Sequence, residues 1–380
     1  MASLRRVAIT GIGLVSSLGE GVEPHRAALK SGAPPVVDTQ AFAPYPVHVM
    51  APLELEKQIP KKSDQRQMEP WQRIGVYAAG LALDDAGLKG DAAALDRLEM
   101  FVAAGGGERD HQVDEAIVNG LRTAADPAAF LNERLMKDLR PTLFLAQLPN
   151  LLAGNISIVH GVTGGSCSFM GEEQAGVDAL RLAVGRITSG QSDAILVGAA
   201  YNAERRDMLL LLAAGGNLRK EPSFAPVFAP ERGGMITGSV GAFLLLEAAE
   251  LAAKRGARVR AEIAGVRAGR ARREQGAVAS EFRRLIGALG SFGANSLGLS
   301  AASGVAPWSG EEREAAADAL AHAPIHASGD VLGHAMEAAF PAAVALAAAM
   351  IDAGDAKEAL VTGAGHWRGE GAAKLIAPGR

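Results

Sequence analysis

Short apolar segments recur along this chain, and between them lie longer stretches with the periodicity of an α-helix. The strand-like segments are residues 5–13, 100–104, 194–197, 243–246, 261–266 and 359–362. Helical periodicity marks residues 70–87, 172–189 and 335–350. Apolar strands that alternate with helices are typical of a sheet covered on both faces. The pattern is present in both halves of the chain and predicts an α/β fold.

Length and composition limit the organisation and the partners. The chain has 380 residues, of which 48% are apolar and 21% charged, which is enough for two ordinary domains or one large two-part domain. No low-complexity linker separates the halves, so we expect them to pack closely. The net charge of −4 gives no support for nucleic acid as a partner. Residues 1–12 hold only a brief apolar run, so we expect no signal peptide, no membrane span and a cytoplasmic protein.

The sequence contains no motif for a cofactor or a metal ion. A single cysteine, Cys167, excludes an internal disulfide framework and a cysteine-rich metal site. The glycine-rich stretches at 105–107 and 363–371 lack the strand–glycine–helix–lysine pattern of a phosphate loop, so we interpret them as turns. We therefore expect neither a cofactor nor a metal.

A glycine-rich turn at residues 161–171 leads into the helix predicted at 172–189. In a layered α/β enzyme, a strand-to-helix turn of this kind is where a nucleophile sits, because the positive helix end activates it. Here the helix begins instead with two carboxylates, Glu172 and Glu173. Cys167 lies inside the apolar run before the turn, where we expect a small buried hydrophobic residue rather than a nucleophile.

Several segments resemble, in order along the chain, the motifs of the 3-oxoacyl-acyl-carrier-protein synthases, or ketosynthases. They are residues 5–19, residues 150–164, residues 190–200, residues 226–247 with Arg232-Gly233-Gly234, and Gly333-His334 followed by Ala338-Ala339. The resemblance covers nearly the whole chain. It implies a thiolase-like, five-layered α-β-α-β-α fold made of two similar halves, here residues 1–250 and 251–380, in one compact unit.

The resemblance fails at most of the positions that carry the family's chemistry. Ketosynthases use a thiolate to accept the acyl chain and two imidazoles to stabilise the charge that develops on decarboxylation. Carried over position by position, the cysteine falls on Glu173, the first histidine on Ala302 or Ser303, the motif lysine on Gly329, the second histidine on His334 and the gating phenylalanine on Ala364. His334 alone keeps the family's residue type, so the chain resembles a degenerate member similar to the chain-length factors, with no catalytic set intact.

Two interpretations stay open for the acidic and imidazole positions. Glu173 stands in the first turn of a helix, where the helix dipole favours any carboxylate by roughly 0.3–1 kcal/mol. It can equally mimic an acylated or ionised cysteine and hold the pocket, or a partner, in one arrangement. His334 is either a hydrogen-bonded core histidine or a residue with a retained chemical role.

Three functions are compatible with this pattern. The first is a catalytically silent partner subunit of an active 3-oxoacyl-ACP synthase that influences acyl chain length in fatty-acid or polyketide biosynthesis. The second is an enzyme with altered chemistry, such as an acyl-ACP decarboxylase or acyltransferase that uses Glu173 and His334. The third is a scaffold for carrier proteins. The loss of chemical motifs beside intact structural ones favours the first, and the chain is then inactive alone.

The expected partners follow from the resemblance. Thiolase-fold proteins pair through the strand before the nucleophile helix, here about residues 166–170, so we expect a heterodimer with an active ketosynthase or a homodimer. An acyl carrier protein is the second expected partner. Four arginines cluster after the middle of the chain and are either a solvated surface or a carrier-protein contact: Arg267, Arg270, Arg272 and Arg273.

Overall fold

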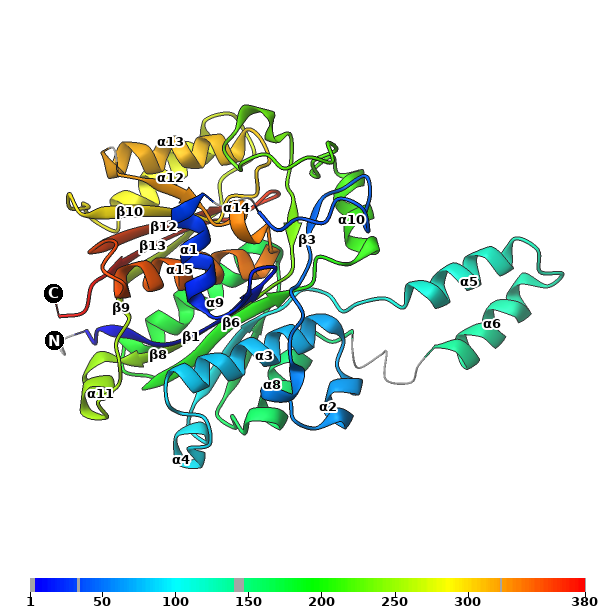
Figure 1. The fold of residues 1–380 in the computed structure, drawn as a ribbon, viewed down its shortest axis with the longest axis horizontal. Helices are drawn as coiled ribbons and strands as arrows, with labels where there is room; N and C mark the ends of the chain where they lie inside the picture. The colour runs from blue at the N-terminus through cyan, green and yellow to red at the C-terminus, as the bar shows by residue number, and fades with distance from the viewer. Residues whose placement is uncertain (1–3, 33–34, 140–146, 322, 380) are drawn as a thin grey trace.

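A computed structural model describes residues 4–32, 35–139, 147–321 and 323–379 of the chain. Its body is layered, as Figure 1 shows: outer helices, strands, central helices, strands and a second set of outer helices. This arrangement confirms the five-layered α-β-α-β-α fold. The layers follow from the apolar strands, which need cover on both faces.

Eleven of the described strands join into one sheet, in the order β11-β10-β12-β13-β9-β1-β8-β6-β4-β5 with β2 beside β1. β1 links the two halves, because it pairs antiparallel with β8 along its length and with β9 over Val7 to Ile9. The larger strands are β1 (Val7–Ser16), β4 (Glu99–Ala103), β5 (Ser166–Phe169), β6 (Ala194–Tyr201), β8 (Val240–Ala248), β9 (Ala261–Gly269), β10 (Ser296–Ser300), β12 (Glu358–Ala364) and β13 (Glu370–Ile376). The short ones are β2 (Gly19–Glu20), β3 (Val47–His48), β7 (Thr237–Gly238) and β11 (Ile325–Ala327), of which β3 and β7 pair separately.

Helices form the three remaining layers. The central layer is α9 (Glu172–Thr188) and α15 (Ala339–Asp352), which contact strands of both halves. One outer layer contains α3 (Pro70–Asp85) and α8 (Leu151–His160), and the other contains α12 (Ala277–Gly287) and α13 (Trp308–Leu320). The others are α1 (Val22–Ser31), α2 (Lys62–Gln67), α4 (Ala92–Leu95), α5 (His111–Leu121), α6 (Pro127–Asp138), α10 (Arg206–Ala214), α11 (Ala249–Lys254) and α14 (Gly329–Leu332). Three short 3₁₀ turns are η1 (Leu55–Lys57), η2 (Pro230–Arg232) and η3 (Met336–Ala338).

Small residues allow the layers to approach closely. A side chain at Gly13 of β1 would place its Cβ 1.8 Å from the carbonyl oxygen of Ala78 in α3. Only glycine therefore permits this helix–sheet contact. In the central layer, the alanine-rich α15 is buried from Ala339 to Ile351, so the abundance of alanine in the composition is explained by a helix packed on all sides.

The predicted helices at 70–87 and 172–189 are confirmed within two residues at either end as α3 and α9. The helix predicted from residue 335 was placed four residues too early, because α15 begins at Ala339. Met336 takes a left-handed φ of 44°, and residues 336–338 form η3 instead.

We propose the division of the chain at residue 250. β1, β4, β5, β6 and β8 all precede it, and β9 to β13 all follow it. Outside this body, α5 and α6 form a hairpin that projects away from the layers (Figure 1). Among the described helices, none has the length and apolar character needed to cross a lipid bilayer.

Candidate functional site

Three side chains from distant segments meet at the N-terminus of α9. Oε1 of Glu173 accepts hydrogen bonds from Nε2 of His334 at 2.8 Å and from Nδ1 of His366 at 2.7 Å. The backbone N–H of His366 donates to the same oxygen at 3.0 Å. All three residues are buried, with exposed fractions of 5%, 2% and 8% for Glu173, His334 and His366.

The backbone holds each of these residues in place. Glu173 enters α9 through Gly171 and Glu172, whose φ angles of 130° and 55° turn the chain sharply from β5 into the helix. Two backbone hydrogen bonds hold His334: its N–H donates to the carbonyl oxygen of Ile236, and its carbonyl oxygen accepts from the N–H of Gly238. A Cβ on Gly238 would lie 1.7 Å from the carbonyl oxygen of Leu332, so this approach requires glycine.

His366 reaches the cluster from the loop after β12. The loop closes on itself through the N–H of Gly365, which donates to Gly369. Arg273 secures it by donating to the carbonyl oxygen of Gly365 at 2.7 Å and to buried Glu370 at 2.5 Å. His366 was missed in the sequence because no local pattern marks a histidine in a glycine-rich loop as a site residue.

The cluster holds Glu173 as a carboxylate. Burial alone raises the pKa of this group, but the hydrogen bonds from His334 and His366 outweigh burial and hold the pKa well below its ordinary value. For His366, burial opposes the charged form, yet the bond to Glu173 raises the pKa of its imidazole. The second carboxylate oxygen, Oε2, and Nδ1 of His334 are both buried and have no hydrogen-bond partner among the described residues.

A cavity of about 540 Å³ lies beside the cluster. Its walls are mainly apolar and include Met170, Met208, Leu211, Leu212, Met336 and Trp367. Glu172, Tyr201, Arg205, Glu337 and His366 supply polar atoms. An apolar pocket with a few convergent polar groups is typical of a ligand site.

Glu337 and Arg205 are two further cavity residues that the sequence did not indicate. The Glu337 carboxylate accepts from the N–H of Gly105 at 2.8 Å, and burial raises its pKa to about 7. Arg205 donates to the carbonyl oxygens of Gly106 and Gly107 and pairs with Asp207 at 2.7 Å. Residues 105–107 are irregular backbone after β4 rather than the turn expected from the sequence, and their peptide groups are held by these two buried side chains.

The other positions identified by resemblance form no hydrogen bond with Glu173 in the part of the chain that the structure describes. Ala302, Ser303 and Gly329 are buried but do not line the cavity. The Ser303 hydroxyl accepts from the N–H of Val305, which is a local turn contact. Ala364 is also buried, and its N–H donates to Glu312 at 2.8 Å. The structure therefore brings Glu173 and His334 together and adds His366.

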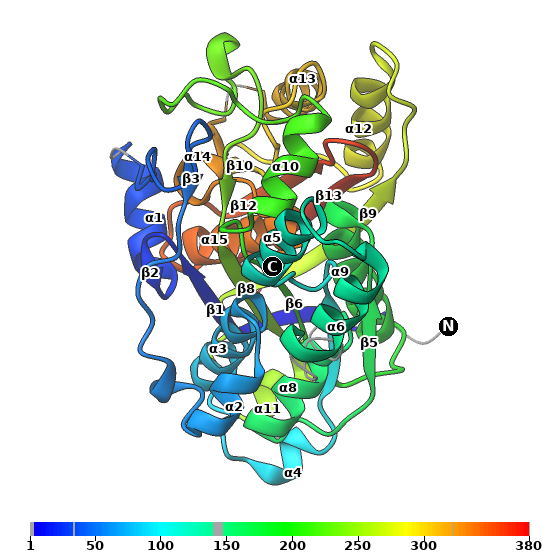
Figure 2. The ribbon, with the colours of Figure 1, turned by 90° about the vertical axis from the view of Figure 1, so that its right-hand side faces the viewer.

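The expectation that Cys167 is a buried hydrophobic residue is wrong. Cys167 is exposed, because β5 ends the sheet and pairs only with β4 among the described strands. Figure 2 shows β5 at this outer position beside α9. The thiol does not line the cavity next to Glu173.

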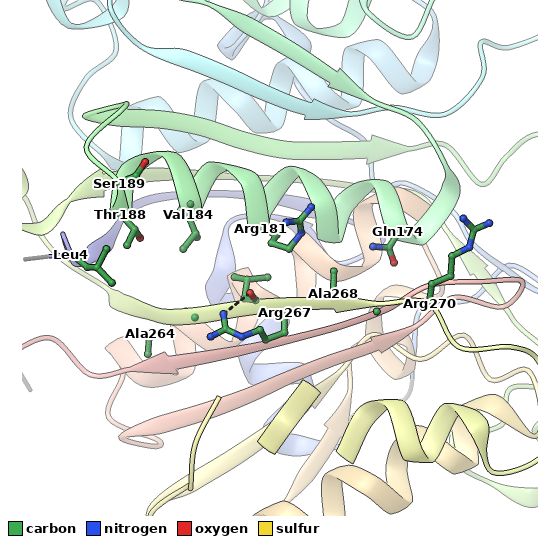
Figure 3. A pocket seen from close by; sticks show the side chains of 14 residues that line it. Leu4, Gln174, Arg181, Val184, Thr188, Ser189, Ala264, Arg267, Ala268 and Arg270 are labelled. Carbon is green, nitrogen blue, oxygen red and sulfur yellow. Dashed lines mark hydrogen bonds between the residues drawn. The ribbon is translucent and has the colours of Figure 1, made fainter. Parts of the chain in front are cut away.

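The arginine cluster divides into two groups. Arg273 pairs with buried Glu370 and donates to the carbonyl oxygen of Gly365, so it has a structural role and is only partly exposed. Arg267, Arg270 and Arg272 are exposed. Arg267 and Arg270, with Arg181 of α9, line a groove of about 880 Å³ between α9 and β9, and Figure 3 shows the three along its length.

Comparison with known proteins agrees with this architecture. Residues 4–252 match the family model described as "Beta-ketoacyl synthase, N-terminal domain". The chain belongs to the beta-ketoacyl synthase family. It is 27% identical over 275 residues to 3-oxoacyl-[acyl-carrier-protein] synthase 2 of Vibrio cholerae and 27% identical over 282 residues to that of Rhizobium meliloti. Each match covers 69% of this chain, which spans about 63% of the length of these curated ketosynthases.

Solved ketosynthase structures share the fold. The "ishigamide ketosynthase/chain length factor" superposes with a TM-score of 0.80 at 23% identity and covers 99% of this chain and 100% of its own. A beta-ketoacyl synthase from Burkholderia phymatum gives a TM-score of 0.82 at 20% identity and covers 98% of this chain and 100% of its own. At these identities the likeness establishes the ketosynthase fold.

Proposed function

We propose that this protein is a catalytically silent ketosynthase-like subunit that pairs with an active 3-oxoacyl-ACP synthase and influences the length of its acyl product. The observation that carries the proposal is the carboxylate of Glu173, which stands at the head of α9 where the resemblance places the acyl-accepting cysteine. One of its oxygens accepts three hydrogen bonds.

A carboxylate bound in this way is unsuited to acyl transfer. Its charge is stabilised by two imidazole donors and one peptide N–H, which lowers its reactivity as a nucleophile. An acyl group on the carboxylate would also form a labile anhydride. The family's chemistry depends on a thiolate at this point, and the described chain has its only free thiol on the exposed face of β5.

The comparisons support ketosynthases and carrier proteins as the class of partner. One structural relative is a "ketosynthase/chain length factor", and another, with a TM-score of 0.77 at 17% identity, is a "type II PKS acyl-carrier protein in complex with its ketosynthase". For this chain we propose β5 as the pairing edge. Residues 166–168 of β5 are exposed, and an unpaired edge is a ready template for another strand.

We also propose Arg267, Arg270 and Arg272 as the carrier-protein contact. They lie exposed at and beyond the end of β9, where positive charge would steer an acidic partner. Replacing all three by serine is expected to weaken binding of a carrier protein, measured by calorimetry at low salt. Unchanged binding would exclude this surface.

The first experiment tests the protein alone. Purified protein is incubated with acyl and malonyl carrier proteins, and the products are read by mass spectrometry. We expect neither 3-oxoacyl product nor a covalent acyl adduct. Turnover, or an adduct on Glu173 or Cys167, would contradict catalytic silence.

One observation favours a second candidate, decarboxylation of a malonyl group. His366 supplies a second imidazole next to His334, and both border a carboxylate. Acetyl carrier protein formed from malonyl carrier protein in the same assay, and lost in His366→Gln, would identify this activity. A carrier-protein scaffold would bind carrier protein but leave the length of the partner's product unchanged.

A further inference from the structure

We propose that Glu173, His334 and His366 form a binding site for one divalent transition-metal ion, with zinc as the best fit. One ligand atom from each residue lies within 4.8 Å of the others, and all three residues are buried. The inference concerns the chemistry of the cluster and does not depend on the role of the protein as a partner subunit.

The types of ligand select the class of metal. Two imidazole nitrogens and one carboxylate oxygen are a set that zinc uses in three-ligand sites. Iron(II) and other first-row ions accept the same set, whereas calcium and magnesium prefer oxygen ligands alone. The absence of a thiol at the cluster removes the ligand type that would favour copper(I) or an iron–sulfur cluster.

The distances require a small opening of the cluster. The two nitrogens now lie 2.8 and 2.7 Å from Oε1, whereas ligands about 2.1 Å from a tetrahedral ion lie about 3.4 Å apart. Binding of the ion through Oε1 would therefore require each nitrogen to move roughly 0.6 Å away from that oxygen. Both unpartnered atoms assist this change, because Oε2 of Glu173 can turn to the ion and Nδ1 of His334 can carry the ring proton that Nε2 gives up.

The surroundings suit a cation with an open coordination position. Oε1 would keep its hydrogen bond from the N–H of His366 while Oε2 binds the ion. Such a hydrogen bond to a ligating carboxylate holds the ligand in its orientation. Glu172 and Glu337 line the adjoining cavity together with His366, and Arg205 and Arg368 line it as well. A fourth ligand, water or a carbonyl oxygen of a bound molecule, would enter from this cavity.

The sequence could not indicate this site because its ligands come from three separate segments. Residue 173 begins α9, residue 334 follows α14 and residue 366 follows β12. None of them belongs to a short metal-binding motif of fixed spacing.

Calorimetry with zinc chloride on metal-stripped, untagged protein tests the proposal. We expect one equivalent of zinc to bind the wild type, and we expect Glu173→Gln and His366→Gln each to bind it at least about tenfold more weakly. His111→Gln is the matched control, because His111 lies on α5 outside the cluster, and it should bind zinc as the wild type does. No zinc binding, or equal affinity in all four proteins, would show that the cluster is a hydrogen-bonded unit alone.

X-ray absorption at the zinc edge of the wild type gives an answer that does not depend on the folding of variants. Two imidazoles and oxygen ligands around the ion are expected. Fewer than two imidazoles, or a sulfur ligand from Cys167, would place the ion elsewhere and overturn the proposal. Loss of this site would leave the assays of catalytic silence and pairing unaffected, so the two proposals fail separately.

Discussion

Replacing Glu173 by glutamine tests the most unusual feature of the fold, a buried carboxylate that joins two histidines. Glutamine has nearly the same shape, and its amide oxygen can take the place of Oε1. The three donors from His334 and His366 then keep an acceptor. What changes is the charge of the acceptor and the atom at the Oε2 position.

The expected cost follows from these two changes. Hydrogen bonds to a charged group contribute about 1.5–3 kcal/mol each, against about 0.5–1.5 kcal/mol for neutral pairs. The two imidazole bonds therefore lose about 1 kcal/mol each. The glutamine side-chain nitrogen would replace Oε2 at a buried position with no acceptor among the described residues. An unpaired buried donor costs about 1–3 kcal/mol, but part of this cost is already present in the wild type, where Oε2 has no partner either. The variant should lose about 3 kcal/mol of unfolding free energy.

Urea denaturation at one fixed protein concentration, without added metal, measures this loss. Glu172→Gln is the matched control, since the neighbouring carboxylate forms no hydrogen bond with the histidines among the described residues and acts on His366 only through its charge; this variant should change the unfolding free energy by less than about 0.5 kcal/mol. If Glu173→Gln is as stable as the wild type, the carboxylate does not stabilise the cluster. If both variants lose the same amount, the effect belongs to the helix terminus rather than to the histidine contacts.

Three further predictions concern the rest of the site. Burial raises the pKa of Glu337 from 4.5 to about 7. The contribution of this group to the free energy of unfolding should therefore be largest below about pH 4.5 and fall by up to about 3 kcal/mol as the pH rises through 7. In urea melts taken from pH 5 to 8, Glu337→Gln should flatten that fall, and an unchanged slope would contradict the prediction. Arg273→Ala should lower the free energy of unfolding by about 3–5 kcal/mol, because it leaves Glu370, which is 0% exposed, without its ion pair. Arg272→Ala on the surface should lower it by less than about 0.5 kcal/mol. Similar melting curves for the two variants would exclude the structural role of Arg273. Cys167 should react rapidly with a thiol reagent in dilute protein and slowly at concentrations where β5 is paired, and a rate independent of concentration would argue against that edge as the interface.

Much of the architecture could be predicted because it rests on local patterns. The apolar strands and the periodic helices at 70–87 and 172–189 determine the layers, and the glycines mark the turns between them. The start of α15 was misplaced because residues 335–338 have helical composition while the left-handed backbone of Met336 interrupts the helix. Exposure of Cys167 was missed since an apolar sequence does not reveal that its strand lies at the end of the sheet.

The site could be predicted only in part, for a different physical reason. Glu173 and His334 stand at positions that a resemblance can identify one at a time. His366, Glu337 and Arg205 become site residues only through the packing of loops from distant parts of the chain. The inward direction of Arg273 has the same origin, because its partner Glu370 is 97 positions away in the sequence.

The central claim is that the protein acts on acyl chain length through an active ketosynthase. It is tested most directly by co-expressing the chain with ketosynthases from its own source, purifying any complex and determining the length of the acyl products by mass spectrometry. The account predicts a one-to-one complex whose products differ in length from those of the ketosynthase alone. Recovery of this chain only by itself, or products of the same length formed at the same rate without it, would contradict the account.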